Sequence, residues 1–217
     1  MYLTVNKSQK SENRTFKPVP AGTHLGRLYR VVDIGTQQGE WEGKITHQRK
    51  LIFYFELFGE DDTGAPLTKD DGRPLIITKY YNATLDQRST FRKDLQNWLK
   101  IDFDNFEEGE RFQIKDILGK YAMVSVIQQT KKNKEIKSKL ESLAAVPTMI
   151  MKSGLPEGVN DIFLFDLEKF DSDKFNSLSE SIRTIISASP EYRKAAQGNA
   201  PKPKTDGFED DLNDVPF

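Results

Sequence analysis

Cysteine is absent from this sequence of 217 residues, and histidine occurs only at His24 and His47. Without cysteine the chain can form neither a disulfide nor a thiolate metal site, and two isolated histidines lack the spacing of a metal-binding motif. A glycine-rich phosphate loop, a nucleophile elbow and a paired-histidine metal motif are also missing. These absences favour a protein that is not an enzyme and that uses no cofactor and no metal.

Long apolar runs are missing as well. No stretch approaches the roughly 18 apolar residues that a helix needs to cross a bilayer. Residues 1–20 are polar and contain several lysines, without the apolar segment of a signal peptide. We therefore expect a cytoplasmic protein that has no membrane partner.

Charge is almost balanced over the whole chain, with 32 Lys and Arg against 33 Asp and Glu. The balance conceals an asymmetry, because residues 205–217 contain five acids and no base. The rest of the chain therefore has 28 acids against 32 bases. A basic body with an acidic end is typical of proteins that contact nucleic acid and carry a regulatory or docking tail.

Residues 45–58 show the clearest strand pattern. Leu51, Phe53, Phe55 and Leu57 alternate with the other positions, which is the period of two expected for a sheet with one buried face. Runs rich in β-branched and aromatic residues predict four more strands, at 24–34, 75–81, 121–128 and 136–143. Residues 37–43 are predicted to form a turn.

Residues 86–99 switch to helical spacing, with Phe91, Leu95 and Trp98 on one apolar stripe and either Asp86 or Ser89 as the cap. Five strands with a helix between the third and the fourth follow the order of the OB-fold. That fold is a small β-barrel that commonly binds single-stranded nucleic acid or oligosaccharide. We therefore predict a mainly β protein built on a five-stranded OB-fold barrel.

The predicted barrel domain covers residues 21–147 and follows a flexible basic arm at 1–20. An extension at 148–193 contains a possible strand at 161–167 and an amphipathic helix at 174–189, which we expect to pack on the barrel. Residues 194–217 are predicted to be a linker followed by an acidic docking tail. Both a monomer and a homo-oligomer are compatible with this organisation.

The tail carries the most specific pattern in the sequence. Its last residue is an aromatic one, which offers a side chain for an apolar pocket and a carboxylate for a basic rim. The acids around it would steer the tail toward a basic partner surface. The predicted partner-binding residues are Phe208, Glu209, Asp210, Asp211, Leu212, Asp214, Val215, Pro216 and Phe217. A merely solubilising tail is the alternative, since runs of charge are ordinarily solvated.

This ending resembles the C-terminal peptide of bacterial single-stranded DNA-binding proteins. Segments 20–23, 56–57, 79–81, 91–98 and 189–192 are similar to the OB-fold single-stranded DNA-binding proteins of tailed bacteriophages. The resemblance implies a phage-encoded protein of the host cytoplasm that coats single-stranded DNA in replication, recombination or repair. It further implies that the tail recruits partners such as a polymerase, a helicase or primase, a nuclease or a recombinase.

Binding of single strands requires rings on which bases stack and cations that follow the phosphates. Strand alternation and position relative to the core select candidates on the first three strands, on the loop before the second strand and on the loop between the last two. They are Arg27, Tyr29, Arg30, Trp41, Lys50, Tyr54, Lys79, Tyr80, Tyr81, Lys131, Lys132 and Lys134. Alternation also sends Tyr80 and Tyr81 to opposite faces, so one of them is expected in the core.

Two other functions remain open at this point. The barrel would bind another protein if the chain were an interaction adaptor of the replication machinery. A more remote alternative is a metal-dependent nuclease that uses the acidic pairs Asp61, Asp62 and Asp70, Asp71, although their loop lacks an EF-hand spacing.

Overall fold

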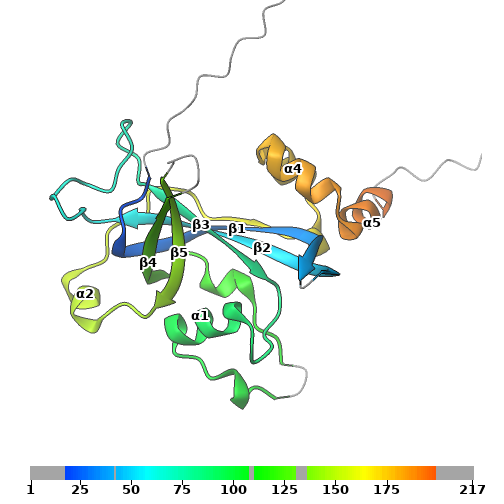
Figure 1. Cartoon of the computed structure of the whole chain (residues 1–217), viewed down its shortest axis with the longest axis horizontal. Helices are drawn as coiled ribbons and strands as arrows, with labels where there is room; N and C mark the ends of the chain where they lie inside the picture. The colour runs from blue at the N-terminus through cyan, green and yellow to red at the C-terminus, as the bar shows by residue number, and fades with distance from the viewer. Residues whose placement is uncertain (1–17, 42, 108–109, 131–135, 199–217) are drawn as a thin grey trace, which may run out of the picture.

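Six strands form one sheet in the computed structural model, which describes residues 18–41, 43–107, 110–130 and 136–198 (Figure 1). The prediction of a mainly β protein is confirmed. The strands are β1 (Gly22–Trp41), β2 (Lys44–Phe58), β3 (Ile76–Asn82), β4 (Tyr121–Thr130), β5 (Ile136–Ala144) and β6 (Phe163–Phe165).

Short helices complete the described part of the chain. The α-helices are α1 (Thr90–Leu99), α2 (Thr148–Ser153), α3 (Ser172–Ser177), α4 (Glu180–Ser187) and α5 (Pro190–Gly198). Three 3₁₀ turns lie at η1 (Phe103–Asn105), η2 (Ile114–Ile117) and η3 (Leu167–Lys169). No helix among the described residues is both long and apolar enough to span a membrane.

The sheet is open. Its antiparallel strands follow the order β3-β2-β1-β4-β5, and β6 adds to β1 in parallel. The expected closed barrel is not present, because no hydrogen-bonded ladder joins β3 to β5 among the described residues. The backbone around Val19 lies in this seam instead, where its carbonyl accepts hydrogen bonds from Ser138 Oγ at 2.6 Å and Gln128 Nε2 at 2.9 Å. Lys79 Nζ also crosses the seam and donates to the carbonyl of Glu141 at 2.6 Å.

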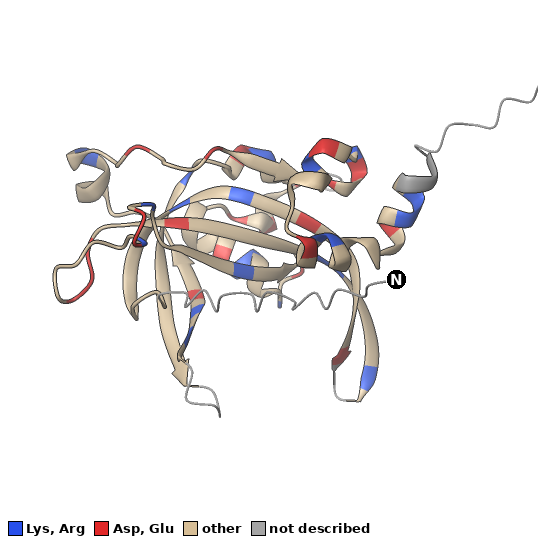
Figure 2. Cartoon of the chain, turned by 90° about the horizontal axis from the view of Figure 1, so that it is seen from above, with Lys and Arg blue, Asp and Glu red and all other residues tan. Residues whose placement is uncertain are grey.

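Two hairpins project beyond the sheet. The predicted turn at residues 37–43 is wrong, because β1 and β2 stay paired from Gln37 and Gln48 to Trp41 and Lys44. The chain reverses next to Gly43, whose φ of +74° suits a glycine. We call residues 36–41 and 44–49 the β1–β2 arm, and residues 128–130 and 136–139 the β4–β5 arm. Figure 2 shows both arms on the same side of the sheet.

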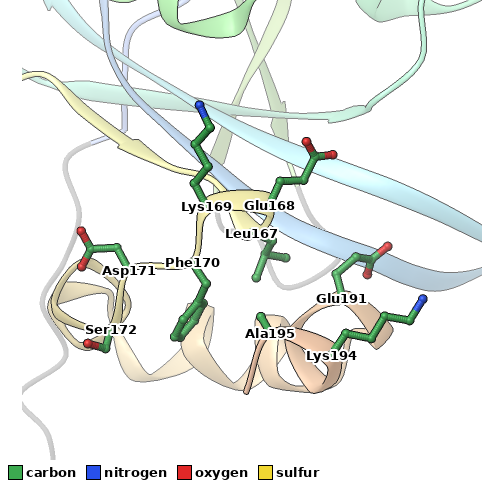
Figure 3. Close-up of a pocket in the computed structure, with 9 residues that line it drawn as sticks. All are labelled: Leu167, Glu168, Lys169, Phe170, Asp171, Ser172, Glu191, Lys194 and Ala195. Carbon is green, nitrogen blue, oxygen red and sulfur yellow. The ribbon is translucent and has the colours of Figure 1, made fainter. Parts of the chain in front are cut away.

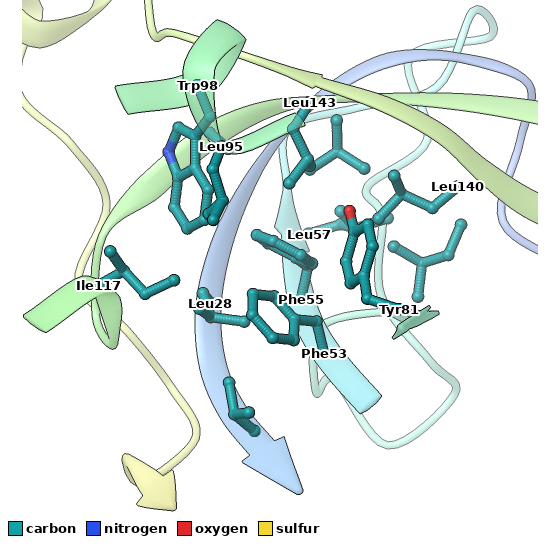
Figure 4. Packing of buried hydrophobic residues seen from close by; sticks show 14 of the residues in the cluster. Leu28, Phe53, Phe55, Leu57, Tyr81, Leu95, Trp98, Ile117, Leu140 and Leu143 are labelled. Atoms are coloured by element: carbon teal, nitrogen blue, oxygen red, sulfur yellow. The ribbon is translucent and has the colours of Figure 1, made fainter. Parts of the chain in front are cut away.

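The main core lies between the inner face of the sheet and α1, as the alternation in β2 predicts. Phe53 and Phe55 are fully buried (Figure 4). The ring centroid of Phe53 lies 5.4 Å from that of Phe91, and the ring centroid of Phe55 lies 5.7 Å from that of Trp98. The apolar stripe of α1 is therefore confirmed. Ser89 is the N-cap, because its hydroxyl accepts a hydrogen bond from the backbone N–H of Phe91.

A second core lies on the outer face of the sheet, where the C-terminal extension packs as predicted. Val32, Ile34 and Ile52 are buried there against Ile182 and Ile186 of α4. The single helix predicted over 174–189 is wrong, because Leu178 adopts an extended conformation and separates α3 from α4. Part of the predicted linker is helical too, since α5 starts at Pro190 and runs to Gly198. Proline is well suited to a first helical position.

Polar contacts around Asn160 attach the N-terminal part of the extension to the sheet. Arg27 Nε lies 3.2 Å from the buried Glu56 Oε1 and forms an ion pair with it, without a hydrogen bond between these two atoms. Arg27 Nη2 donates a hydrogen bond to the carbonyl of Asn160 at 2.7 Å. Glu56 Oε2 accepts hydrogen bonds from the backbone and side-chain nitrogens of Asn160 at 2.9 and 2.6 Å. A Cβ at Gly158 would collide with the Arg27 guanidinium.

A second set of polar contacts holds the base of the β1–β2 arm. Arg49 pairs with Asp33 at 2.5 Å and with Glu168 at 2.7 Å. Glu191 of α5 accepts hydrogen bonds from the backbone N–H of Thr36 at 2.8 Å and from its hydroxyl at 2.6 Å. The extension therefore fixes the arm relative to the sheet.

Candidate functional site

One row of side chains crosses four strands on the outer face of the sheet. Register places Phe163 of β6 beside Arg30 of β1, Arg30 beside Tyr54 of β2, and Tyr54 beside Thr78 of β3. We call these four residues the cross-strand row. Neighbouring side chains on one face of a sheet lie close enough to interact.

Arg30 is the charged member of the row, and its guanidinium lies between two rings. The guanidinium carbon is 4.5 Å from the centroid of the Phe163 ring and 5.2 Å from that of Tyr54. Cation–π contacts of this kind are worth about 0.5–2 kcal/mol and hold the guanidinium in place. Its buried Nε has no hydrogen-bond partner, and no carboxylate among the described residues forms an ion pair with Arg30. The row therefore presents a positioned cation without a counter-ion.

The tyrosines beside Arg30 remain uncharged at physiological pH. Burial raises the pKa of Tyr29 to about 12, and the Tyr29 ring packs edge-on against Tyr54 at 6.4 Å. Burial also raises the pKa of Tyr54, although the positive charge of Arg30 opposes the shift. A neutral ring does not repel a phosphate, so the row combines an apolar surface with one positive charge.

Tyr80 on β3 extends this surface and is 55 % exposed, whereas the adjacent Tyr81 is 3 % exposed. The expected division of the two tyrosines between surface and core is confirmed. Tyr80 lines two hollows. We call them the seam groove, of about 560 Å³ between β3 and β5, and the polar hollow, of about 900 Å³ between β2, β3 and the loop before α1.

The seam groove combines apolar and basic side chains. Ile76 and Ile136 contribute apolar surface, while Lys137 and Lys139 of the β4–β5 arm are exposed at its wall. None of the described residues that line it is acidic. Its charge and shape therefore suit an extended polyanion with apolar groups.

The polar hollow has a different character. Gln48 of the β1–β2 arm, Asn82, Gln87 and Arg88 line it, and Asp86 is its one acidic lining residue among those the structure describes. Amides supply both hydrogen-bond donors and acceptors, whereas lysines supply only donors. The two hollows beside Tyr80 thus offer different chemistry.

The structure brings together three of the residues that the sequence suggested, namely Arg30, Tyr54 and Tyr80. Lys50 lies half-buried on β2 opposite Asn82, at the side of the polar hollow. Trp41 ends β1 in the β1–β2 arm, but its side chain lies outside the described residues. Lys131, Lys132, Lys134 and the whole predicted tail also fall outside them.

Other predicted residues are placed elsewhere. Arg27 is engaged with Glu56 and Asn160, and Tyr29 is 8 % exposed. Lys79 turns inward to Asp94 at 2.6 Å, and Tyr81 donates to the same carboxylate at 2.7 Å. These four are therefore structural in the described conformation, because partners within the chain or burial occupy their groups.

The prediction from sequence missed members of the site, among them Phe163, Lys137 and Lys139. Phe163 is far from Arg30 along the chain and reaches it only through the parallel pairing of β6 with β1. Lys137 and Lys139 do carry a signal, since they alternate in a predicted strand whose Leu140 and Leu143 face the core. That alternation would have placed both lysines on the surface.

A third hollow, of about 960 Å³, lies between η3 and α5 (Figure 3). Its wall carries Glu168, Asp171 and Glu191 beside Lys169 and Lys194. Three carboxylates make it a poorer match for a polyanion than the seam groove.

In the loop that contains the acidic pairs, Asp61 and Asp71 have structural roles. Asp61 Oδ1 accepts hydrogen bonds from the backbone N–H groups of Thr63 and Ala65, both at 2.9 Å. Asp71 pairs with Arg73 at 2.6 Å. Within the described residues, no group of three or more His, Cys, Asp or Glu side chains is arranged to hold a metal ion.

Comparison with protein-family models gives no match for this sequence, and comparison with curated proteins gives none either.

Proposed function

We propose that this protein is a non-catalytic single-stranded DNA-binding protein. It coats exposed strands during replication or recombination and recruits partner proteins through its acidic tail. The observation that carries the proposal is Arg30, a cation held between Tyr54 and Phe163 without a counter-ion among the described residues, on the face of the sheet that also carries the exposed ring of Tyr80. Nucleic acid supplies both of the groups that this surface lacks, namely phosphates and flat bases.

The strand order supports an OB-type architecture for the proposed function. In the sheet, β1 pairs with β2 and with β4, β3 pairs with β2, and β5 pairs with β4. In the chain, α1 lies between β3 and β4. Closing the seam between β3 and β5 would complete the five-stranded barrel of that fold. The two arms would then flank the binding face, as the loops of OB-folds commonly do.

In the proposed mechanism, one phosphate binds at Arg30 and a neighbouring base stacks on Tyr80. Lys137 and Lys139 follow the next phosphates along the seam groove. Stacking on one ring contributes about 1–3 kcal/mol whatever the base, which suits a protein that coats DNA. Partner recruitment is the role proposed for residues 208–217.

A titration of fluorescent oligo-dT at several salt concentrations tests the proposal. We expect saturable binding whose logarithmic affinity falls linearly with log salt, because bound phosphates release counter-ions. A duplex of the same length should compete poorly, since its bases are not available for stacking. Absence of salt-sensitive binding to the single strand would overturn the proposal.

A protein-interaction adaptor remains the second candidate, and one surface favours it. Met149, Met151, Val159 and Ile162 are 81, 51, 58 and 49 % exposed. The segment is held by part-buried hydrogen bonds, which Asn160 donates to Glu56 and Pro156 accepts from Tyr121. Exposed apolar side chains in a fixed segment are typical of protein interfaces. Under this alternative, replacing these four residues by serine abolishes partner binding, and oligo-dT is not bound.

A further inference from the structure

We propose that the polar hollow is a nucleobase-reading subsite, so that this protein distinguishes bases as well as single strands. The inference rests on the proposed function. It goes further by giving the two hollows different tasks, with the phosphate track in the seam groove and recognition of one base edge in the polar hollow.

The first argument is the set of free polar groups around the hollow. The side chains of Gln48, Asn82, Gln87 and Arg88 are all exposed, and none makes a hydrogen bond or an ion pair with another described residue. Each amide offers two donor hydrogens and one acceptor oxygen, and the guanidinium offers a planar fork of donors. Such groups match the edges of nucleobases, which alternate donors and acceptors.

The second argument is that the backbone beneath these side chains is held in place. Ala83 N donates to the carbonyl of Arg49 at 2.8 Å, and Ser89 N donates to the carbonyl of Asp86 at 2.8 Å. Arg92 Nη1 donates to the carbonyl of Leu85 at 3.2 Å and so holds the middle of the loop against α1. The polar side chains therefore start from fixed positions, which lowers the entropy lost on binding.

The third argument is the position of Tyr80 at the border of the hollow. A base that stacks on the exposed ring of Tyr80 directs its edge either into the seam groove or into the polar hollow. In the seam groove the edge would meet mainly apolar side chains and lysines, with Gln129 as the single amide among the described lining residues. In the polar hollow it meets amides and a guanidinium.

A base edge is available to this hollow only when it is not paired in a duplex, so the subsite also reinforces selection of single strands. One good bidentate contact discriminates between bases by roughly fivefold or more. We therefore expect the protein to bind oligo-dT, oligo-dA and oligo-dC of equal length with affinities that span at least threefold.

The test compares these affinities in the full-length protein and in the variants Gln48→Ala, Asn82→Ala and Gln87→Ala. The readout is the ratio of affinities among the three oligomers, because a general loss of affinity or of folded protein cancels in that ratio. At least one variant should reduce the spread to less than half of its wild-type value. Asn97→Ala removes an exposed amide from α1 outside both hollows and should leave the ratio unchanged.

A spread of less than threefold among the wild-type affinities would overturn the base-reading subsite while leaving the proposed function intact. A wild-type spread that none of the three variants reduces to less than half would also overturn it, because the discrimination would then arise elsewhere. Failure of the wild-type protein to bind any of the oligomers would overturn both the subsite and the proposed function.

Discussion

Arg30 and Tyr54 lie side by side on neighbouring strands, with the guanidinium carbon 5.2 Å from the centroid of the tyrosine ring. Phe163 covers the other side of the guanidinium at 4.5 Å. The charge of Arg30 is thus positioned by aromatic rings, while no carboxylate among the described residues neutralises it. An anion that reached this face would meet a fixed cation and two rings.

Replacing the exposed ring of Tyr80 tests the stacking surface. Tyr80→Ala should weaken binding of oligo-dT by roughly 5- to 150-fold, because one stacked base contributes about 1–3 kcal/mol. Tyr80→Phe keeps the ring and should bind within about twofold of wild type. Fluorescence anisotropy measures both affinities, and equal affinities of the two variants would exclude stacking at Tyr80.

The acidic tail is expected to compete with DNA for the basic surface. Removal of residues 205–217 deletes five acids and should tighten binding of oligo-dT at low salt. The difference between truncated and full-length protein should shrink as salt is added, since screening weakens the competition. Unchanged affinity of the truncated protein at low salt would exclude this role of the tail.

Breaking the buried ion pair should loosen the extension. Arg27→Met leaves Glu56, which is fully buried, without its cation, and such a loss typically costs about 3–5 kcal/mol of folding free energy. The double variant Arg27→Met, Glu56→Gln should recover much of that stability because no uncompensated charge remains. Urea denaturation measures both variants, and a double variant as unstable as the single one would contradict this role for the pair.

Attachment of the extension should weaken in acid. Burial would raise the pKa of Glu191, but hydrogen bonds from Thr36 outweigh burial and hold the pKa below its ordinary value. The hydrogen bond from Arg49 likewise lowers the pKa of Glu168. A carboxylate with a lowered pKa in the folded state stabilises the fold above its unfolded pKa, and this contribution is lost as pH falls through the folded value.

Urea midpoints measured from pH 7 down to pH 3 test this dependence. The wild-type protein should lose stability below about pH 4.5, near the ordinary pKa of glutamate. Glu191→Gln should be less stable at pH 7 and should show a shallower loss in acid. A Glu191→Gln profile parallel to that of wild type would exclude the contact with Thr36 as a source of the pH dependence.

The sequence predicts the inner face of the sheet better than the outer one. Alternation in β2 and the stripe of α1 identify the main core, because burial on one face leaves a regular period. The same reasoning separates Tyr80 from Tyr81 correctly. Lys79 is predicted to bind DNA, but it shares the inner face with Tyr81 and pairs with Asp94 of α1.

The cross-strand row depends on features that leave no local pattern. A β-bulge between Leu28 and Arg30 shifts the alternation of β1, so that Leu28 and Val31 both enter the main core. Strict alternation would have turned Arg30 inward with Leu28. The neighbour Phe163 comes from a strand of three residues whose parallel pairing with β1 is a long-range contact. Neither the bulge nor that pairing can be read from a window of neighbouring residues.

The salt dependence of oligo-dT binding by Arg30→Met tests the central claim most directly. Methionine fills the space between the two rings without the charge, and Lys93→Met removes an exposed lysine of α1 that lines neither hollow. If Arg30 binds one phosphate, the slope of log affinity against log salt should become shallower by about 0.7 in Arg30→Met and should not change in Lys93→Met. Identical slopes for wild type and Arg30→Met would contradict the proposal that the cross-strand row binds the DNA backbone.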